Sequence, residues 1–265
     1  MRSETVMTND EPKQPGSVTA ALLIIGDEIL SGRTQDRNIG HIANVLSEAG
    51  ISLREVRIVP DVECEIIDAV NSLRRRYRYL FTTGGIGPTH DDITTDAIGR
   101  AFGVAVNEDE RAVEAMRKHA PDAKLSGRRM RMARIPEGAT LVDNIVSGAP
   151  GYMLENVIVM AGIPRIMQAM MQAVLPRLEK GRKIAARQVR VDAPEGDVAP
   201  GLAALQTAFP SVQIGSYPFY EEGSVGTYVV LRSVEPSDLT RALEDLWSLI
   251  AEQGFAASDA DDGKK

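Results

Sequence analysis

The chain of 265 residues is 43% hydrophobic and 25% charged, with a formal net charge of −7 and a pI of about 5.2. These values are typical of a globular protein, and the acidic balance argues against nucleic acid or an anionic membrane surface as the main partner. The single cysteine, Cys64, excludes an intrachain disulfide. No apolar run reaches the roughly 18 residues of a membrane span, and residues 1–17 lack the apolar segment of a signal peptide, so we expect a cytoplasmic protein.

The first 17 residues are polar and carry Pro, Gly and Ser, which predicts a disordered leader. Strand and helix patterns then alternate. Continuous apolar runs predict buried strands, and apolar residues spaced three and four apart predict helices. The expected strands are 19–25, 53–60 and 79–85, and the expected helices are 36–50, with Asp36 as its N-cap, and 64–76.

The same alternation continues through residue 178. Helices are expected at 94–102, from 107 to 120, and at 165–178, with an extended segment at 131–144 that turns at 136–138 and a hairpin turn at Glu155-Asn156. Strands that alternate with helices of modest length predict a three-layer α/β sandwich with a mostly parallel sheet, over residues 18–180.

A break near residues 178–187 precedes a second pattern of strand, helix, strand, strand and helix. This order predicts a small α+β domain over residues 185–254, with its first helix at 198–210. The polar residues 255–265 are expected to form a disordered tail.

The loop TTGGIGPTHDDIT at 82–94 follows an expected strand and leads into a helix. In an open α/β sheet this is the edge where ligands bind, and successive glycine N–H groups can bind an anion. Asp91 and Asp92 would repel a phosphate. One of them could serve only as the helix N-cap, but that function needs one side chain and not two. A divalent cation held by Asp91 and Asp92 would join the carboxylates to the phosphate.

The segment GDEILSGRTQDRN at 26–38 also follows a buried strand, so Glu28 and Asn38 are expected at the same edge. The alternative is that its acids are solvated loop residues. The basic residues Arg128, Arg129 and Arg131 could bind phosphate, but we favour a solvated surface. The sequence Gly223-Ser-Val-Gly226 matches the GxxG loop of an RNA-binding fold, yet it follows two acids and is expected to be a hairpin turn that does not bind nucleic acid.

These segments together resemble the molybdopterin-binding domain superfamily. The resemblance rests on GDEILSGRTQDRN, TTGGIGPTHDDIT, ARIPEGATLVDN, SGAPGY and MAGIPRIMQAM, in that order over residues 19–178, and on VQIGSYPF in the second unit. The most similar branches are the N-terminal part of competence/damage-inducible protein A (CinA-like proteins) and the molybdopterin-binding domain of FAD synthases. GGIGPTHDD differs from the GGTG typical of the adenylyltransferases, which favours the CinA-like branch.

The resemblance implies roles for individual residues. Asp91 and Asp92 would be the catalytic and metal-binding pair, for Mg²⁺, Mn²⁺ or Co²⁺. The expected ligand-binding residues are Gly26, Glu28, Asn38, Thr83, Gly84, Gly85, Gly87, Thr89, Ser147, Gly148, Pro150, Gly162 and Pro164.

The resemblance implies three functions. The leading hypothesis is a metal-dependent hydrolase of dinucleotide pyrophosphates such as ADP-ribose or FAD. The second is a molybdopterin adenylyltransferase of molybdenum cofactor biosynthesis, and the third is a non-catalytic molybdopterin or nucleotide sensor. The expected partner in each case is a nucleotide or pterin small molecule, with neither nucleic acid nor membrane, and the family favours homo-oligomers.

Overall fold

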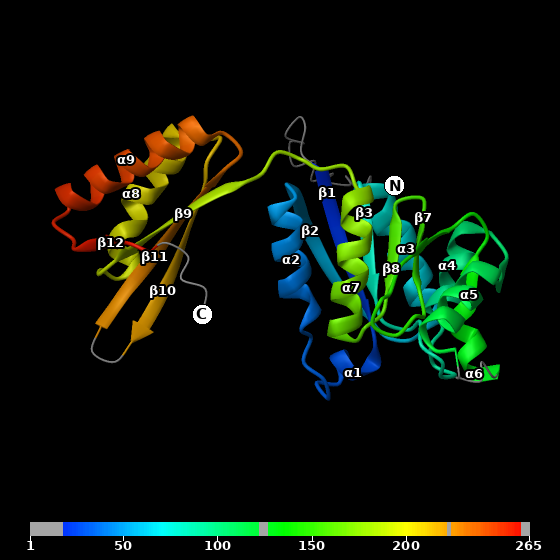
Figure 1. The fold of residues 1–265 in the computed structure, drawn as a ribbon. Helices are drawn as coiled ribbons and strands as arrows, with labels where there is room; N and C mark the ends of the chain where they lie inside the picture. Colours follow the sequence, from blue (N-terminus) through cyan, green and yellow to red (C-terminus); the bar gives the residue numbers. More distant parts are fainter. Residues whose placement is uncertain (1–17, 122–126, 222–223, 261–265) are drawn as a thin grey trace, which may run out of the picture. The chain divides into compact units, whose positions relative to one another are not determined.

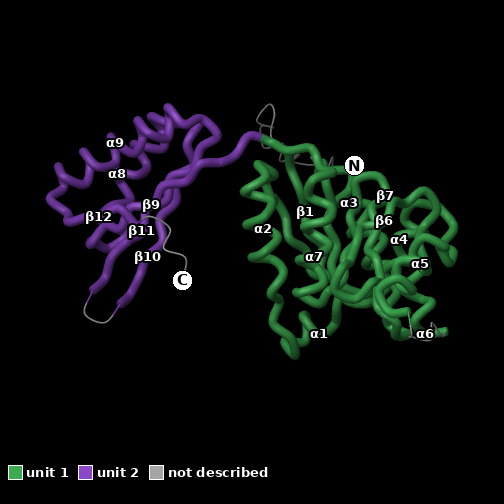
Figure 2. The backbone as a smooth tube through the Cα atoms, in the orientation of Figure 1, with its two compact units in different colours: residues 1–181 green, residues 182–265 purple. Residues whose placement is uncertain are grey.

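The computed structural model describes residues 18–121, 127–221 and 224–260. It divides the chain into two compact units, residues 1–181 and 182–265 (Figure 2). The expected leader and the last five residues lie outside the described part of the chain. No helix among the described residues is long and apolar enough to span a membrane.

The first unit is built on a sheet with the strand order β2-β1-β3-β8-β7-β6 (Figure 1). Neighbouring strands are parallel from β2 to β8. Strand β7 is antiparallel to β8, and β6 is antiparallel to β7. The strands are β1 Val18–Ile25, β2 Ile51–Val59, β3 Tyr79–Thr83, β6 Thr140–Val142, β7 Gly151–Leu154 and β8 Val157–Met160. Helices are α1 Asp27–Leu30, α2 Asn38–Glu48, α3 Glu63–Arg76, α4 Thr94–Phe102, α5 Glu110–His119, α6 Gly127–Met130 and α7 Pro164–Val174.

Strand β1 shows why the unit has three layers. Its odd-numbered residues Ala21, Leu23 and Ile25 join a core cluster with α3, α4 and α5, and its even-numbered residues join another with α2 and α7. Alternate side chains of a strand point to opposite faces, so a run that is apolar throughout needs cover on both sides. The predicted three-layer, mostly parallel α/β fold is confirmed.

The chain passes from β1 to β2 on one side and then to β3 on the other side of β1. The order in which strands are added to the sheet therefore reverses between β1 and β3. Ligands of open α/β sheets bind outside the carboxyl ends of the strands at such a point. Both loops singled out in the sequence begin there, because Gly26 follows β1 and Gly84 follows β3.

Two local predictions in the first unit are wrong. The helix expected from residue 107 begins at Glu110, since residues Val106–Glu108 form β4, which pairs with β5 Arg134–Pro136, and the Asp109 side chain caps the helix. The segment 131–144, expected to be extended, begins with a 3₁₀ helix at Arg131–Ala133. A three-residue strand depends on a partner 26 or more positions away, which periodicity does not show.

The second unit has an antiparallel sheet in the order β10-β11-β9-β12, with α8 and α9 packed on it through one core cluster. Its elements are β9 Ala185–Val191, α8 Glu195–Ala208, β10 Gln213–Glu221, β11 Ser224–Ser233, α9 Pro236–Glu252 and β12 Ala257–Asp259. The α+β prediction is confirmed. Two details are corrected: α8 spans residues 195–208 and not 198–210, and residues 257–259 of the expected tail pair with β9. The expected turn at Gly223 lies partly outside the described residues.

Candidate functional site

The ends of β1, β3 and β8 come together through glycine backbones. Gly84 has φ +104°, and a Cβ on it would lie 2.0 Å from the carbonyl oxygen of Ile25 at the end of β1. A Cβ on Gly162, after β8, would lie 3.3 Å from the Gly84 Cα. Only glycine allows these approaches without displacing a neighbour. Gly84 and Gly162 therefore hold the two loops that follow β3 and β8 side by side.

The glycine loop is fixed where it enters α4. Thr94, fully buried, donates from its backbone N–H to the Gly85 carbonyl at 3.0 Å and from its hydroxyl to the Gly84 carbonyl at 3.0 Å. Gly84 and Gly85 both have positive φ. Successive residues of unusual φ can turn neighbouring N–H groups toward one anion. The loop thus has the backbone form expected of an anion-binding turn.

Asp91 and Asp92 converge on Thr89. The Thr89 hydroxyl contacts both carboxylates, at 2.6 Å for Asp92 Oδ2, and the Thr89 backbone N–H donates to Asp92 Oδ2 at 2.7 Å. The hydrogen bond from Thr89 lowers the pKa of Asp91. The cap position of α4 is Ile93, and no side chain caps this helix. The N-cap interpretation of the aspartates is therefore wrong.

The donor set fits a divalent cation of the magnesium type. Among the described residues, no group of three or more His, Cys, Asp or Glu side chains is arranged to hold a metal. Mg²⁺ in phosphate-binding sites is held by one or two carboxylates together with phosphate oxygens and water. The exposed Asp91 and the partly exposed Asp92, beside the glycine loop, satisfy this requirement. A cation that needs a full set of protein ligands would not fit.

Asp61, which follows β2, is a residue that the sequence analysis missed. Its Oδ2 accepts a hydrogen bond from the Asp27 backbone N–H at 2.9 Å. Burial raises the pKa of Asp61, and the charges of Glu28, Asp27 and Asp91 raise it further. Acids that follow β1 and β3 therefore lie within electrostatic reach of Asp61, which follows β2. The available signal was position, because Asp61 comes just after the expected strand 53–60.

Asn38 connects two predicted ligand segments. Its side chain is 4% exposed, and Nδ2 donates to the Gly162 carbonyl at 2.8 Å. The cap position of α2 is Arg37 and not the predicted Asp36, but the Asp36 side chain accepts hydrogen bonds from the backbone N–H groups of Asn38 and Ile39, at 3.0 and 2.8 Å. Glu28 lies beside Gly26, where a Cβ would be 2.6 Å from its Oε2.

The remaining predicted ligand residues lie in several elements of the first unit. Thr83, the last residue of β3, is 1% exposed, and Pro164 begins α7. Ser147 accepts from Asn144 Nδ2 at 2.6 Å, and Gly148, with φ +77°, lies against His119. Pro150 shares a small cavity with Ile86 of the glycine loop. Contact of these five residues with a ligand stays a prediction.

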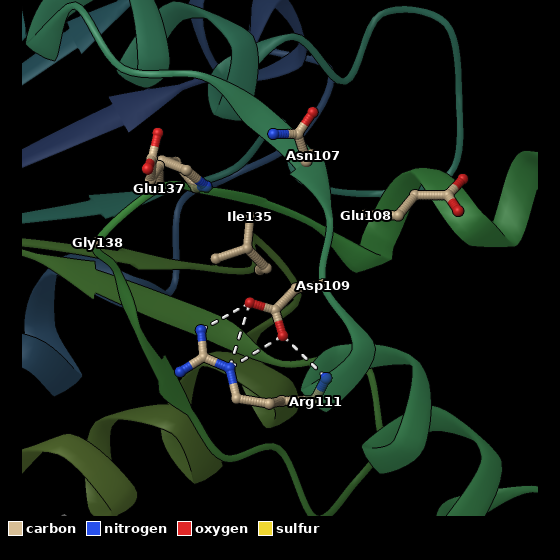
Figure 3. A pocket seen from close by; sticks show the side chains of 8 residues that line it. Asn107, Glu108, Asp109, Arg111, Ile135, Glu137 and Gly138 are labelled. Atoms are coloured by element: carbon tan, nitrogen blue, oxygen red, sulfur yellow. Dashed lines mark hydrogen bonds and ion pairs between the residues drawn. The ribbon is translucent and has the colours of Figure 1, made fainter.

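A depression of about 340 Å³ lies elsewhere (Figure 3). It is lined by Asn107, Glu108, Asp109, Arg111, Ile135, Pro136, Glu137 and Gly138. Arg111 donates to Asp109 Oδ2 at 2.6 Å and to the Ala139 carbonyl at 3.2 Å, so its charge is already compensated. None of the predicted site residues lines this depression, and the Asp109–Arg111 pair holds the start of α5.

Two family models match successive parts of the chain. Residues 21–180 match a model described as probable molybdopterin binding domain, and residues 183–259 match one described as FAD synthase, middle domain. The matched segments correspond closely to the two compact units of the structure.

Individual relatives agree with these matches. A CinA-like protein of Desulfosudis oleivorans is 36% identical over 209 residues, covering 74% of this chain and 51% of that protein. Protein TK1472 of Thermococcus kodakarensis is 32% identical over 246 residues, covering 86% of this chain and 96% of that protein. The crystal structure of CinA from Thermoplasma acidophilum, described as of unknown function, is 31% identical, with a TM-score of 0.57 over 61% of this chain and 98% of that one. The chain therefore belongs to the molybdopterin-binding domain family, in which it is CinA-like.

Proposed function

We propose that the protein binds a phosphorylated nucleotide at the carboxyl edge of the sheet and hydrolyses its diphosphate link, with ADP-ribose and FAD as model substrates. The observation that carries the proposal is the convergence of Asp91 and Asp92 on Thr89, directly beside the glycine loop. Carboxylates would repel a phosphate bound by the backbone of the glycine loop, and a divalent cation between the two groups would relieve this repulsion.

The chain's own residues would have separate roles in binding the phosphate and the cation. Backbone N–H groups of Gly84, Gly85 and Gly87 would bind phosphate oxygens, and Asp91 and Asp92 would hold Mg²⁺, Mn²⁺ or Co²⁺. Such a cation supplies Lewis-acid polarisation of a phosphoryl oxygen. In the overall reaction the oxygen of a water bonds to one phosphorus, the bond from that phosphorus to the bridging oxygen breaks, and the bridging oxygen leaves with the second phosphate. Two phosphate monoesters result.

The test is a chromatographic assay of ADP-ribose, FAD and NAD with Mg²⁺, Mn²⁺ and Co²⁺. The double variant Asp91→Asn/Asp92→Asn is expected to lose activity by 100-fold or more, on the order of what one charged catalytic group contributes. Asp68→Asn/Asp245→Asn removes two exposed carboxylates and serves as the control. Metal-independent turnover, or equal activity of the two double variants, would contradict the proposal.

The family model described as a probable molybdopterin binding domain supports a second candidate, a pterin ligand at the same edge. The protein would then transfer an adenylyl group to molybdopterin or act as a sensor without turnover. Adenylyl transfer predicts ATP consumption only when molybdopterin is supplied. A sensor predicts that Asp91→Asn changes ligand affinity and that no turnover is detected with any substrate. Light scattering with and without ligand would test the expected homo-oligomer.

A further inference from the structure

Arg131 reaches the glycine loop from a distant part of the chain. It begins the short 3₁₀ helix Arg131–Ala133 before β5, and its Nη2 donates to the backbone carbonyl of Asp92 at 3.4 Å. The sequence favoured a solvated surface for the whole basic run. That expectation holds for Arg128 and Arg129, which are exposed, but Arg131 is half-buried.

The inward end of Arg131 is enclosed. A small cavity of about 10 Å³ is bordered by Arg131, Thr95, Tyr152, Ile86 and Pro150. Ile86 belongs to the glycine loop and Pro150 to a predicted ligand segment. The Nε atom of Arg131 is buried without a hydrogen-bond partner among the described residues. The side chain therefore passes inward beside the loop instead of extending into solvent.

The charge of Arg131 lacks a counter-ion in the described part of the chain. Three residues further on, Arg134 makes a double hydrogen bond to Asp96, at 2.6 and 2.9 Å. Among the residues that the structure describes, Arg131 has one hydrogen-bond partner, the Asp92 carbonyl. A partly buried guanidinium without a compensating anion is unfavourable, and a planar guanidinium is well suited to bind phosphate oxygens.

We propose that Arg131 is a substrate-binding residue, whose guanidinium binds a phosphate oxygen of a ligand held at the glycine loop. The inference rests on the proposed site and requires a ligand that places a phosphate group there, as opposed to an uncharged nucleoside or pterin. Arg131 supplies positive charge on the protein at the loop that also carries Asp91 and Asp92.

The experiment measures calorimetric binding of ADP-ribose, AMP and adenosine in Mg²⁺ to the full chain and its variants. Arg131→Gln is expected to weaken ADP-ribose binding about 10- to 100-fold, the range for a hydrogen bond between charged groups, and to leave adenosine binding within about twofold. Arg128→Gln and Arg129→Gln carry the same charge change at exposed neighbours and are expected to bind like wild type. Arg131→Lys keeps the charge but not the planar guanidinium. Its affinity for ADP-ribose should lie between those of wild type and Arg131→Gln.

Several outcomes would overturn the inference. The inference fails if Arg131→Gln binds ADP-ribose as Arg128→Gln does. It also fails if Arg131→Gln loses affinity for adenosine and ADP-ribose equally, which would show that Arg131 only stabilises the loop. If Arg131→Gln does not fold, Arg131→Lys is the test, and an affinity for ADP-ribose equal to that of wild type overturns the inference. If ADP-ribose binding depends on Arg131 but wild type shows no turnover, the inference about Arg131 is supported and the proposed hydrolase activity is contradicted. Turnover with an unchanged KM in Arg131→Gln supports the hydrolase and overturns the inference.

Discussion

Asp61 shows how one side chain can be stabilising through a hydrogen bond and unfavourable through its charge. It accepts the Asp27 backbone N–H, which anchors the loop after β1, yet it lies near the carboxylates of Asp27, Glu28 and Asp91. Burial is the first cause of its raised pKa. The folded protein therefore binds a proton at Asp61 more readily than the unfolded chain does, and its contribution to stability falls as pH rises between the unfolded and folded pKa values.

Asp61→Asn is accordingly expected to stabilise the protein more at pH 7 than at pH 4, relative to wild type. An asparagine can still accept the Asp27 N–H, while the charge is removed. Urea denaturation in the presence of a chelator, at both pH values, measures the difference. Asp68→Asn, at an exposed position on α3, is the control and should show no such pH dependence. If Asp61→Asn changes the free energy of unfolding by the same amount at pH 4 and pH 7, the expectation is refuted.

The connection from β3 to α4 depends on how closely it approaches β1. Gly84 has a positive φ, and its missing Cβ makes room for the Ile25 carbonyl. The parallel pairing of β1 with β3, from Ala20 with Tyr79 to Ile24 with Thr83, brings these backbones together. The shape of the glycine loop is thus determined by the register of two strands as well as by its own glycines.

Gly84→Ala is expected to lower the free energy of unfolding by more than the roughly 1–3 kcal/mol of a strained φ, because a backbone overlap is added. Gly32→Ala is a matched control, since Gly32 also has a positive φ, of +72°, but has no atom within 4 Å of the added Cβ. Denaturation of both variants by urea gives the comparison. Equal losses of stability would show that conformation alone, without the close contact to Ile25, accounts for Gly84.

Each unit has its own hydrophobic core. The clusters of the first unit contain residues up to Leu178, and the cluster of the second contains residues from Val189 to Ile250. A chain with separate cores can unfold in separate transitions. The only tryptophan, Trp247 on α9, packs against the core of the second unit and can report on it selectively.

Leu231→Ala, at a fully buried position of β11, is expected to lower the stability reported by Trp247 fluorescence by about 2–5 kcal/mol. Leu73→Ala, equally buried on α3 in the first unit, should leave the fluorescence transition unchanged and shift the transition seen by far-ultraviolet circular dichroism. If both variants shift both signals alike, the two units unfold as one.

The sequence alone determined the features that depend on neighbouring residues. Three local patterns predicted their structures. The apolar run predicted β1, Glu155-Asn156 predicted the turn between β7 and β8, and the glycines that precede Asp91 and Asp92 predicted the loop after β3. Only the tertiary structure placed β4 and β12 in sheets, because each is three residues long and depends on a distant partner strand. It also decided that the aspartates bind Thr89 and do not cap α4, that Asp61 joins the edge, and that Arg131, unlike Arg128, turns toward the loop. Periodicity records which face of an element is apolar, whereas strand order and register decide which distant polar groups meet.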